Sequence, residues 1–124
     1  MNTKKTIGRW GEGLAASYLE GIGYFIMERN VYTPYGEIDL IARQDRPEGS
    51  IIVFVEVKTR RTKAFGPPED SVDARKQAHF ISAAEYFIQQ YPDPSVAWRL
   101  DVIAIQYLDR RRPPQITHFE NAIA

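Results

Sequence analysis

Apolar residues recur at intervals of three and four in two stretches of the chain, which is the spacing of one helix face. The first stretch covers residues 8–22, and Gly21 and Gly23 near its end provide a stop. The second covers residues 74–91, follows Asp73 as a helix N-cap and ends in the segment YPDPS. The pattern therefore predicts two amphipathic helices.

Other runs are rich in β-branched and aromatic residues, which is typical of strands. They are residues 24–32, 37–43, 51–59 and 97–107, with a short final strand at 115–119. The turns TPYG and QDRPEGS are short, so the first three strands should pair antiparallel. The second helix then serves as the crossover into the fourth strand. This order predicts an α/β fold in which a mixed sheet carries a helix on each face.

The chain has 124 residues, a length typical of one domain, and we expect residues 1–124 to form it. No run approaches the roughly 18 apolar residues of a membrane-spanning helix, and the start lacks the apolar segment of a signal peptide. We therefore expect a cytoplasmic protein with no membrane partner. The absence of cysteine excludes disulfides and thiolate metal sites, which leaves oxygen and imidazole ligands for any metal.

Sixteen basic and sixteen acidic side chains give a formal net charge of zero, so the chain has no global basic footprint. Positive charge is nevertheless concentrated in three short runs, at residues 58–63, 75–76 and 109–112. Each run taken singly is typical of solvated surface.

Charged residues interrupt the most apolar strand, VFVEVKTR. Glu56 and Lys58 follow Phe54 on one face of that strand, and the valines on the other face are apolar as well. A strand of this kind is covered on both sides. Burying a carboxylate there costs roughly several kcal/mol unless it is paired or binds a cation.

Alternation in the preceding strand places Glu37 and Asp39 on the same face as Ile41. Ile38 and Leu40 then fall on the opposite face. Because the two strands are neighbours in the hairpin order, we expect Asp39 and the glutamate of the following strand to converge at one rim of the sheet.

Glu12 lies inside the apolar arc of the first helix, so its carboxylate should point toward the sheet. Several carboxylates and one lysine, without cysteine, describe a site for a hard cation such as Mg²⁺ or Mn²⁺. Attack of water on a phosphodiester is the chemistry that needs this arrangement, because the metal neutralises developing charge and acidifies the water.

The segments GEIDLI (36–41) and VFVEVKTR (53–60) resemble the bipartite Asp, then Glu-x-Lys, signature of the PD-(D/E)xK nuclease superfamily. Ile38 stands where the name of the superfamily has a proline. More narrowly, the chain resembles the bacterial UPF0102 family, also called the YraN family. That likeness includes GRWGEGLAASYLEGIGY, SVDARKQ (71–77) and RLDVIAI (99–105), and so covers nearly the whole chain. It implies a restriction-endonuclease-like core.

The resemblance also implies roles for individual residues. Asp39 and Glu56 would coordinate the divalent metal, with the backbone carbonyl of Val57 as a further ligand. Lys58 would position the attacking water. Glu12 would correspond to the acid that Holliday-junction-resolvase-like members of the superfamily bring to the metal from the first helix.

Three residues near this rim have two interpretations each. Glu37 could accept hydrogen bonds beside the metal, but its place after Pro34 and Gly36 favours a solvated turn residue. Lys76 and Gln77 could contact a phosphate or a metal-bound water, or could lie on exposed helix surface.

Arg60, Arg61 and Lys63 directly follow the catalytic strand, so they could form a loop that contacts phosphates. Arg99 and Asp101 share a strand face and are expected to form a structural pair. The histidines are too isolated to suggest a ligand pair, and a surface or satisfied core position is expected for each. Core positions are also expected for six aromatic residues, namely Trp10, Tyr24, Phe25, Tyr86, Phe87 and Trp98.

The leading hypothesis is a metal-dependent nuclease acting on DNA, in structures formed during recombination or repair. One alternative is a catalytically inactive nuclease fold that binds nucleic acid or a protein partner. Another is a structural interaction domain in which the acids and Lys58 form a buried network. No base-reading element is visible, so the sequence leaves open DNA or RNA, exonuclease or endonuclease, the form of the substrate, and a monomer or a homodimer.

Overall fold

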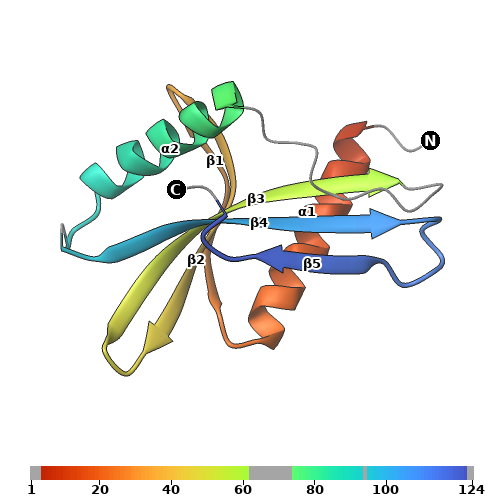
Figure 1. The fold of residues 1–124 in the computed structure, drawn as a ribbon, viewed down its shortest axis with the longest axis horizontal. Helices are drawn as coiled ribbons and strands as arrows, with labels where there is room; N and C mark the ends of the chain where they lie inside the picture. The colour runs from red at the N-terminus through yellow and green to blue at the C-terminus, as the bar shows by residue number, and fades with distance from the viewer. Residues whose placement is uncertain (1–3, 62–73, 94, 123–124) are drawn as a thin grey trace.

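The structure is a computed structural model that describes residues 4–61, 74–93 and 95–122 (Figure 1). Its helices and strands follow the predicted order, including the short final strand. They are α1 (Lys4–Gly21), β1 (Phe25–Thr33), β2 (Gly36–Arg46), β3 (Gly49–Arg61), α2 (Ala74–Gln89), β4 (Ala97–Tyr107) and β5 (Gln115–Phe119). Within these described ranges, no helix is long and apolar enough to cross a membrane. The N-cap predicted at Asp73 lies outside the described residues.

The five strands form one mixed sheet in the order β1-β2-β3-β4-β5. β3 and β4 are parallel, and all other neighbours are antiparallel. α2 lies between β3 and β4 in the sequence and so belongs to the crossover that parallel neighbours require. The α/β architecture with a mixed sheet is confirmed, and it is consistent with a restriction-endonuclease-like core.

Each helix covers a different face of the sheet, as predicted (Figure 1). α1 packs through Ala15, Ala16 and Leu19 onto a cluster that includes Val53 and Val55. α2 packs through Phe80, Ala83 and Ala84 onto a cluster that includes Ile52 and Phe54. β3 is therefore apolar on both faces because both are covered, which explains the continuous run of its sequence.

The predicted alternation along β2 is wrong at one point. Ile38 packs in the cluster below α2, whereas Leu40 packs in the cluster below α1, so the two residues do not share a face. The reason is that the β2–β3 ladder runs only from Arg46↔Gly49 to Leu40↔Val55. Beyond that pair β2 stays in register with β1, but Asn30 of β1, opposite Asp39, has a φ of 51°, which interrupts the regular pleat that strict alternation assumes.

Two of the six aromatic residues assigned to the core are exposed. Phe25 is 57% exposed at the start of the edge strand β1, where the Arg43 guanidinium lies 4.8 Å from its ring centroid. Tyr86 is 37% exposed on α2. Phe87 and Trp98 do pack edgewise on Phe54, as expected for core residues. The periodic spacing of apolar residues in the sequence therefore assigns too many aromatic side chains to the core.

α1 approaches β3 most closely at Gly11, which is buried. A Cβ atom at this position would overlap the Thr59 side-chain hydroxyl oxygen. Glycine is therefore required by the close approach of the helix and not by its backbone conformation. Since Glu12 is the next residue, this contact also sets where the Glu12 carboxylate reaches the sheet.

We expect Gly11→Ala to destabilise the protein by roughly 1–3 kcal/mol, because the added methyl forces α1 away from Thr59. Gly13→Ala is the matched control, since nothing lies within 4 Å of a Cβ there. It should stabilise the helix by roughly 0.5–1 kcal/mol. Denaturant unfolding measures both. The double variant Gly11→Ala with Thr59→Ala should recover part of the loss, and equal effects of the two glycine substitutions would contradict the packing argument.

Candidate metal centre

Four acidic side chains come together at the rim of the sheet where β2 begins. Glu12 comes from α1, Glu37 and Asp39 come from β2, and Glu56 comes from β3. Carboxylate oxygens of Glu12, Glu37 and Asp39 all lie within 4.8 Å of one another. Glu56 lines the same groove of about 570 Å³ as Glu12 and Asp39.

Asp39 is fixed by a hydrogen bond to the backbone of the neighbouring strand. The Val57 N–H donates to the Asp39 Oδ2 at 2.8 Å, just past the last ladder pair of β2 and β3. The carboxylate thus takes the place of the carbonyl that would continue the ladder. Asp39 consequently reaches Glu12 on the α1 side of the sheet, although Ile41 packs toward α2.

Asn30 connects two of the acids and was missed by the sequence analysis. Its side-chain amide nitrogen donates to Glu12 Oε1 at 2.9 Å and to Glu37 Oε1 at 2.8 Å. The backbone of Asn30 has a φ of 51°, which asparagine tolerates better than most residues. The available signal was an asparagine within a strand, where this residue is depleted.

Burial and mutual repulsion dominate the electrostatics of the cluster. Burial, followed by the neighbouring charges of Glu56, Glu12 and Glu37, raises the pKa of Asp39 to about 8, against the opposing hydrogen bond from Val57. Burial also raises the pKa of Glu56, although Lys58 and Lys76 act in the opposite direction. Near neutral pH the cluster therefore holds protons that ordinary carboxylates would have lost.

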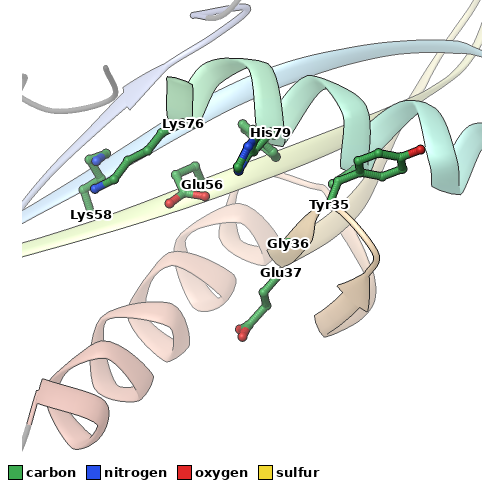
Figure 2. Close-up of a pocket in the computed structure, with 9 residues that line it drawn as sticks. Tyr35, Gly36, Glu37, Glu56, Lys58, Lys76 and His79 are labelled. Atoms are coloured by element: carbon green, nitrogen blue, oxygen red, sulfur yellow. The ribbon is translucent and has the colours of Figure 1, made fainter. Parts of the chain in front are cut away.

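A pocket of about 220 Å³ lies on the α2 side of Glu56 (Figure 2). Lys58, which is only 9% exposed, and Lys76 from the first turn of α2 line this pocket with Glu56, and Figure 2 shows both side chains to one side of that glutamate. His79 and Tyr35 complete the polar lining. The sequence analysis treated His79 as isolated, but it lies one helical turn after Lys76 and faces the same pocket.

The remaining predicted residues have four different outcomes. Glu37 is exposed, as a turn residue would be, yet its carboxylate belongs to the cluster. Arg60 and Arg61 line the groove, whereas Gln77 is half-buried and lines neither this groove nor the pocket of Figure 2. Lys63 lies outside the described residues.

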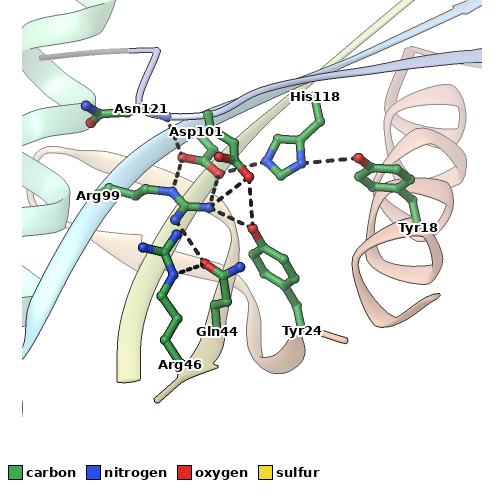
Figure 3. Close-up of polar contacts among 9 residues, drawn as sticks. Tyr18, Tyr24, Gln44, Arg46, Arg99, Asp101, His118 and Asn121 are labelled. Carbon is green, nitrogen blue, oxygen red and sulfur yellow. Dashed lines mark hydrogen bonds and ion pairs between the residues drawn. The ribbon is translucent and has the colours of Figure 1, made fainter. Parts of the chain in front are cut away.

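A second polar cluster lies at the other end of α1 and is centred on the fully buried Asp101 (Figure 3). Its carboxylate accepts hydrogen bonds from Arg99 Nε at 2.9 Å, His118 Nε2 at 2.7 Å and the Asn121 N–H at 2.9 Å. Arg99 also donates to the Tyr24 hydroxyl at 2.7 Å. The expectations of a structural pair at Arg99 and Asp101, and of a satisfied histidine at His118, are confirmed.

The sequence also matches a known protein family. A model described as "Uncharacterised protein family UPF0102" matches residues 11–105. The chain belongs to the UPF0102 family.

Relatives in this family are similar over nearly their whole length. A UPF0102 protein of Syntrophotalea carbinolica is 40% identical over 119 residues, which cover 94% of this chain and 90% of the relative. UPF0102 proteins of Syntrophomonas wolfei and Geotalea daltonii are each 42% identical, over 95% and 98% of this chain and over 97% and 91% of those relatives.

The donor set of this UPF0102 protein fits a hard divalent cation. All the converging groups are carboxylate oxygens, which suit Mg²⁺ or Mn²⁺. A cation would relieve the repulsion that raises the pKa of Asp39. The close group differs from the predicted ligand set, because it contains Glu37 and not Glu56. Metal ligation by Glu12, Asp39, Glu56 and the Val57 carbonyl stays a prediction.

We expect Asp39→Asn to stabilise the metal-free protein at about pH 8 by roughly 1–3 kcal/mol. The folded-state pKa of Asp39 is raised, so the folded protein binds more protons than the unfolded chain, and wild-type stability should fall as the pH rises from about 4 to about 8. Asparagine removes this loss but keeps an oxygen for the Val57 N–H. Denaturant unfolding across this range measures the effect, with Asp45→Asn as an exposed control. A variant less stable than wild type at every pH would favour a structural network.

The opposite result is expected at Asp101. Burial would raise the pKa of its carboxyl, but the hydrogen bonds from His118, Arg99 and the Asn121 backbone outweigh burial and lower it. Asp101→Ala removes the buried acid that pairs with the nearly buried Arg99 and accepts a hydrogen bond from His118, and it should cost roughly 3–5 kcal/mol. That contribution is present above about pH 4 and should be lost as the pH falls further. Asp45→Ala, which removes an exposed pair with Arg43 and an exposed hydrogen bond from Ser50, should change stability little.

Proposed function

We propose that this UPF0102 protein is a divalent-metal-dependent nuclease that hydrolyses phosphodiester bonds in DNA. The observation that carries the proposal is the convergence of the Glu12, Glu37 and Asp39 carboxylates beside Glu56 and Lys58 at one rim of the sheet. The resemblance of the strands carrying Asp39, Glu56 and Lys58 to the PD-(D/E)xK signature supports the same chemistry. Branched or damaged DNA formed during recombination or repair is the proposed substrate, and the cytoplasm is the proposed location.

Glu12, Asp39, Glu56 and the carbonyl of Val57 would hold Mg²⁺ or Mn²⁺, with Glu37 close enough to join them or to accept a hydrogen bond from a bound water. When bound, the cation supplies neutralisation of the charge that develops on the phosphate and acidification of the attacking water. Asn30 keeps Glu12 and Glu37 in place by donating to both. The protein therefore contributes a rigid set of oxygen donors whose positions are fixed before substrate arrives.

Lys58 is the group that would act on the reacting atoms from the protein side. Its ammonium lies at the Glu56 side of the site, and its charge favours the ionised form of that glutamate. Being nearly buried, Lys58 has little freedom to turn toward bulk water. It is suited to donate a hydrogen bond to the attacking water or to a phosphate oxygen, where charge develops in the transition state. Lys76 of α2 lines the same pocket and adds positive charge that acts on Glu56.

The test separates metal binding from catalysis. Mn²⁺ titration calorimetry should show binding by wild type and by Lys58→Ala, and a large loss of affinity in Asp39→Asn. Metal-dependent cleavage of branched, single-stranded and duplex DNA should fall by roughly 10²–10⁴-fold in Lys58→Ala. Asp39→Asn should lose cleavage as well. Because metal binding must displace the proton held by Asp39, wild-type affinity for Mn²⁺ should rise between about pH 6 and about pH 8.

Asp45→Asn is the control for both measurements, because Asp45 is exposed and far along β2 from the cluster. Full cleavage by Lys58→Ala would refute the role given to this lysine. Mn²⁺ binding of equal strength in wild type and Asp39→Asn would refute the metal site. DNA binding without cleavage at saturating metal would favour the catalytically inactive binding module.

A further inference from the structure

The groove that holds the Asp39 carboxylate continues beyond the candidate metal centre. Its far end is lined by Arg61 and Tyr107. A second cavity, of about 420 Å³, shares these two residues and extends to Arg110 and Arg111 in the turn between β4 and β5. The two cavities therefore form one continuous surface from the carboxylates to this turn.

The turn carries more positive charge than its one acid can balance. Asp109 organises it by accepting a hydrogen bond from the Arg111 N–H at 2.8 Å. The same carboxylate lies 3.5 Å from Arg112 Nε and 4.0 Å from Arg111 Nε. The turn thus contains three arginines and one aspartate, and the side chains of Arg111 and Arg112 are 94% and 68% exposed. Pairs this exposed leave the guanidinium groups able to exchange partners.

Two arginines on this surface are held in place by the fold. Arg61 Nε donates to the Leu108 carbonyl at 3.2 Å, which ties the end of β3 to the segment after β4. The Arg110 guanidinium lies 5.0 Å from the ring centroid of Trp10, and Trp10 packs edgewise on Tyr107, also at 5.0 Å. The start of α1, the end of β3 and the turn are therefore braced against one another. Guanidinium groups positioned in this way lose less side-chain freedom when they bind an anion.

We propose that the basic groove, defined by Arg60, Arg61 and residues 110–112, binds the sugar-phosphate backbone of the nucleic-acid strand that enters the metal centre. This inference rests on the proposed nuclease function and extends it to the substrate path. A cluster of carboxylates repels a polyanion, and a chain of zero net charge cannot offset that repulsion globally. The positive charge that the substrate needs must therefore lie beside the acids, and the basic groove is where it lies. Guanidinium contacts to phosphates carry no base information, so binding should be independent of sequence.

The fold offers a charge-matched control. β3 and β4 run parallel, so the end of β3 and the turn after β4 lie at the same end of the sheet, whereas the β2–β3 turn lies at the other end (Figure 1). Arg46 closes β2 beside that distant turn and is exposed. Its removal changes the net charge as much as removal of an arginine from the basic groove, without touching the groove.

The experiment is a fluorescence-anisotropy titration of labelled single-stranded, duplex and branched oligonucleotides in EDTA, at salt concentrations from about 50 to about 200 mM. Relative to wild type, Arg110→Ala and Arg111→Ala, made as separate variants, should each bind several-fold more weakly at the lowest salt, and in each the slope of log affinity against log salt should be smaller by roughly one. Arg46→Ala should match wild type. Arg110→Lys should keep the slope, which separates the charge of this residue from its packing on Trp10.

Unchanged affinity and slope in both Arg110→Ala and Arg111→Ala, an equal effect of Arg46→Ala, or no binding of any oligonucleotide by wild type would each overturn the basic groove as the substrate path. Asp39→Asn distinguishes this failure from failure of the nuclease proposal. If it loses metal-dependent cleavage while the arginine variants bind normally, the nuclease proposal stands and the basic groove does not. If wild type never cleaves DNA but the arginine variants bind more weakly than wild type, the basic groove stands and the nuclease proposal does not.

Discussion

The arrangement of this rim depends on one hydrogen bond, from the Val57 N–H to the Asp39 carboxylate. It replaces a ladder bond at the point where β2 and β3 separate, after the pair Leu40↔Val55. Because a side chain and not the backbone accepts this bond, β2 continues beyond this point paired with β1 and no longer with β3. Asp39 then reaches Glu12 on the α1 side, while Lys58 of β3 faces α2. Glu56 lines the cavities on both sides. Side chains from the α1 face and from the α2 face of the sheet therefore meet at this rim.

Asp39 and Asp101 show how differently one residue type behaves in two buried settings. Asp101 accepts hydrogen bonds from the side chains of Arg99 and His118 and from a backbone N–H. These hydrogen bonds lower its pKa despite complete burial. Asp39 lies among other carboxylates, and its pKa is raised. The first arrangement stabilises the fold because it joins β4 to the ends of α1 and β5. The second works against stability, and the cation proposed for these oxygens would relieve its crowding.

Much of the fold and part of the site could be predicted because both are encoded locally. Periods of two and of three to four located every helix and strand, and Glu12, Asp39 and Glu56 stood out as acids in apolar surroundings. Asn30 could not be found in this way, because its role depends on an unusual φ and on two partners brought together by folding. The face assigned to Ile38 was wrong since alternation was taken to continue where the ladder ends. His79 and Tyr35 required knowledge of how α2 lies against the sheet.

The topology explains why opposite charges gather at one end of a molecule that is neutral as a whole. Because β3 and β4 are parallel, the segment after Glu56 and the arginine turn after β4 lie at the same end of the sheet. The crossover through α2 brings Lys76 back to that end of the sheet, and α1 adds Glu12 there. The acids are thus flanked by cations from three separate parts of the sequence. Net charge, which sums over the whole surface, conceals this separation. A neutral chain can therefore carry, at one end of its sheet, both the negative groups proposed to hold a metal and the positive groups proposed to hold a nucleic-acid backbone.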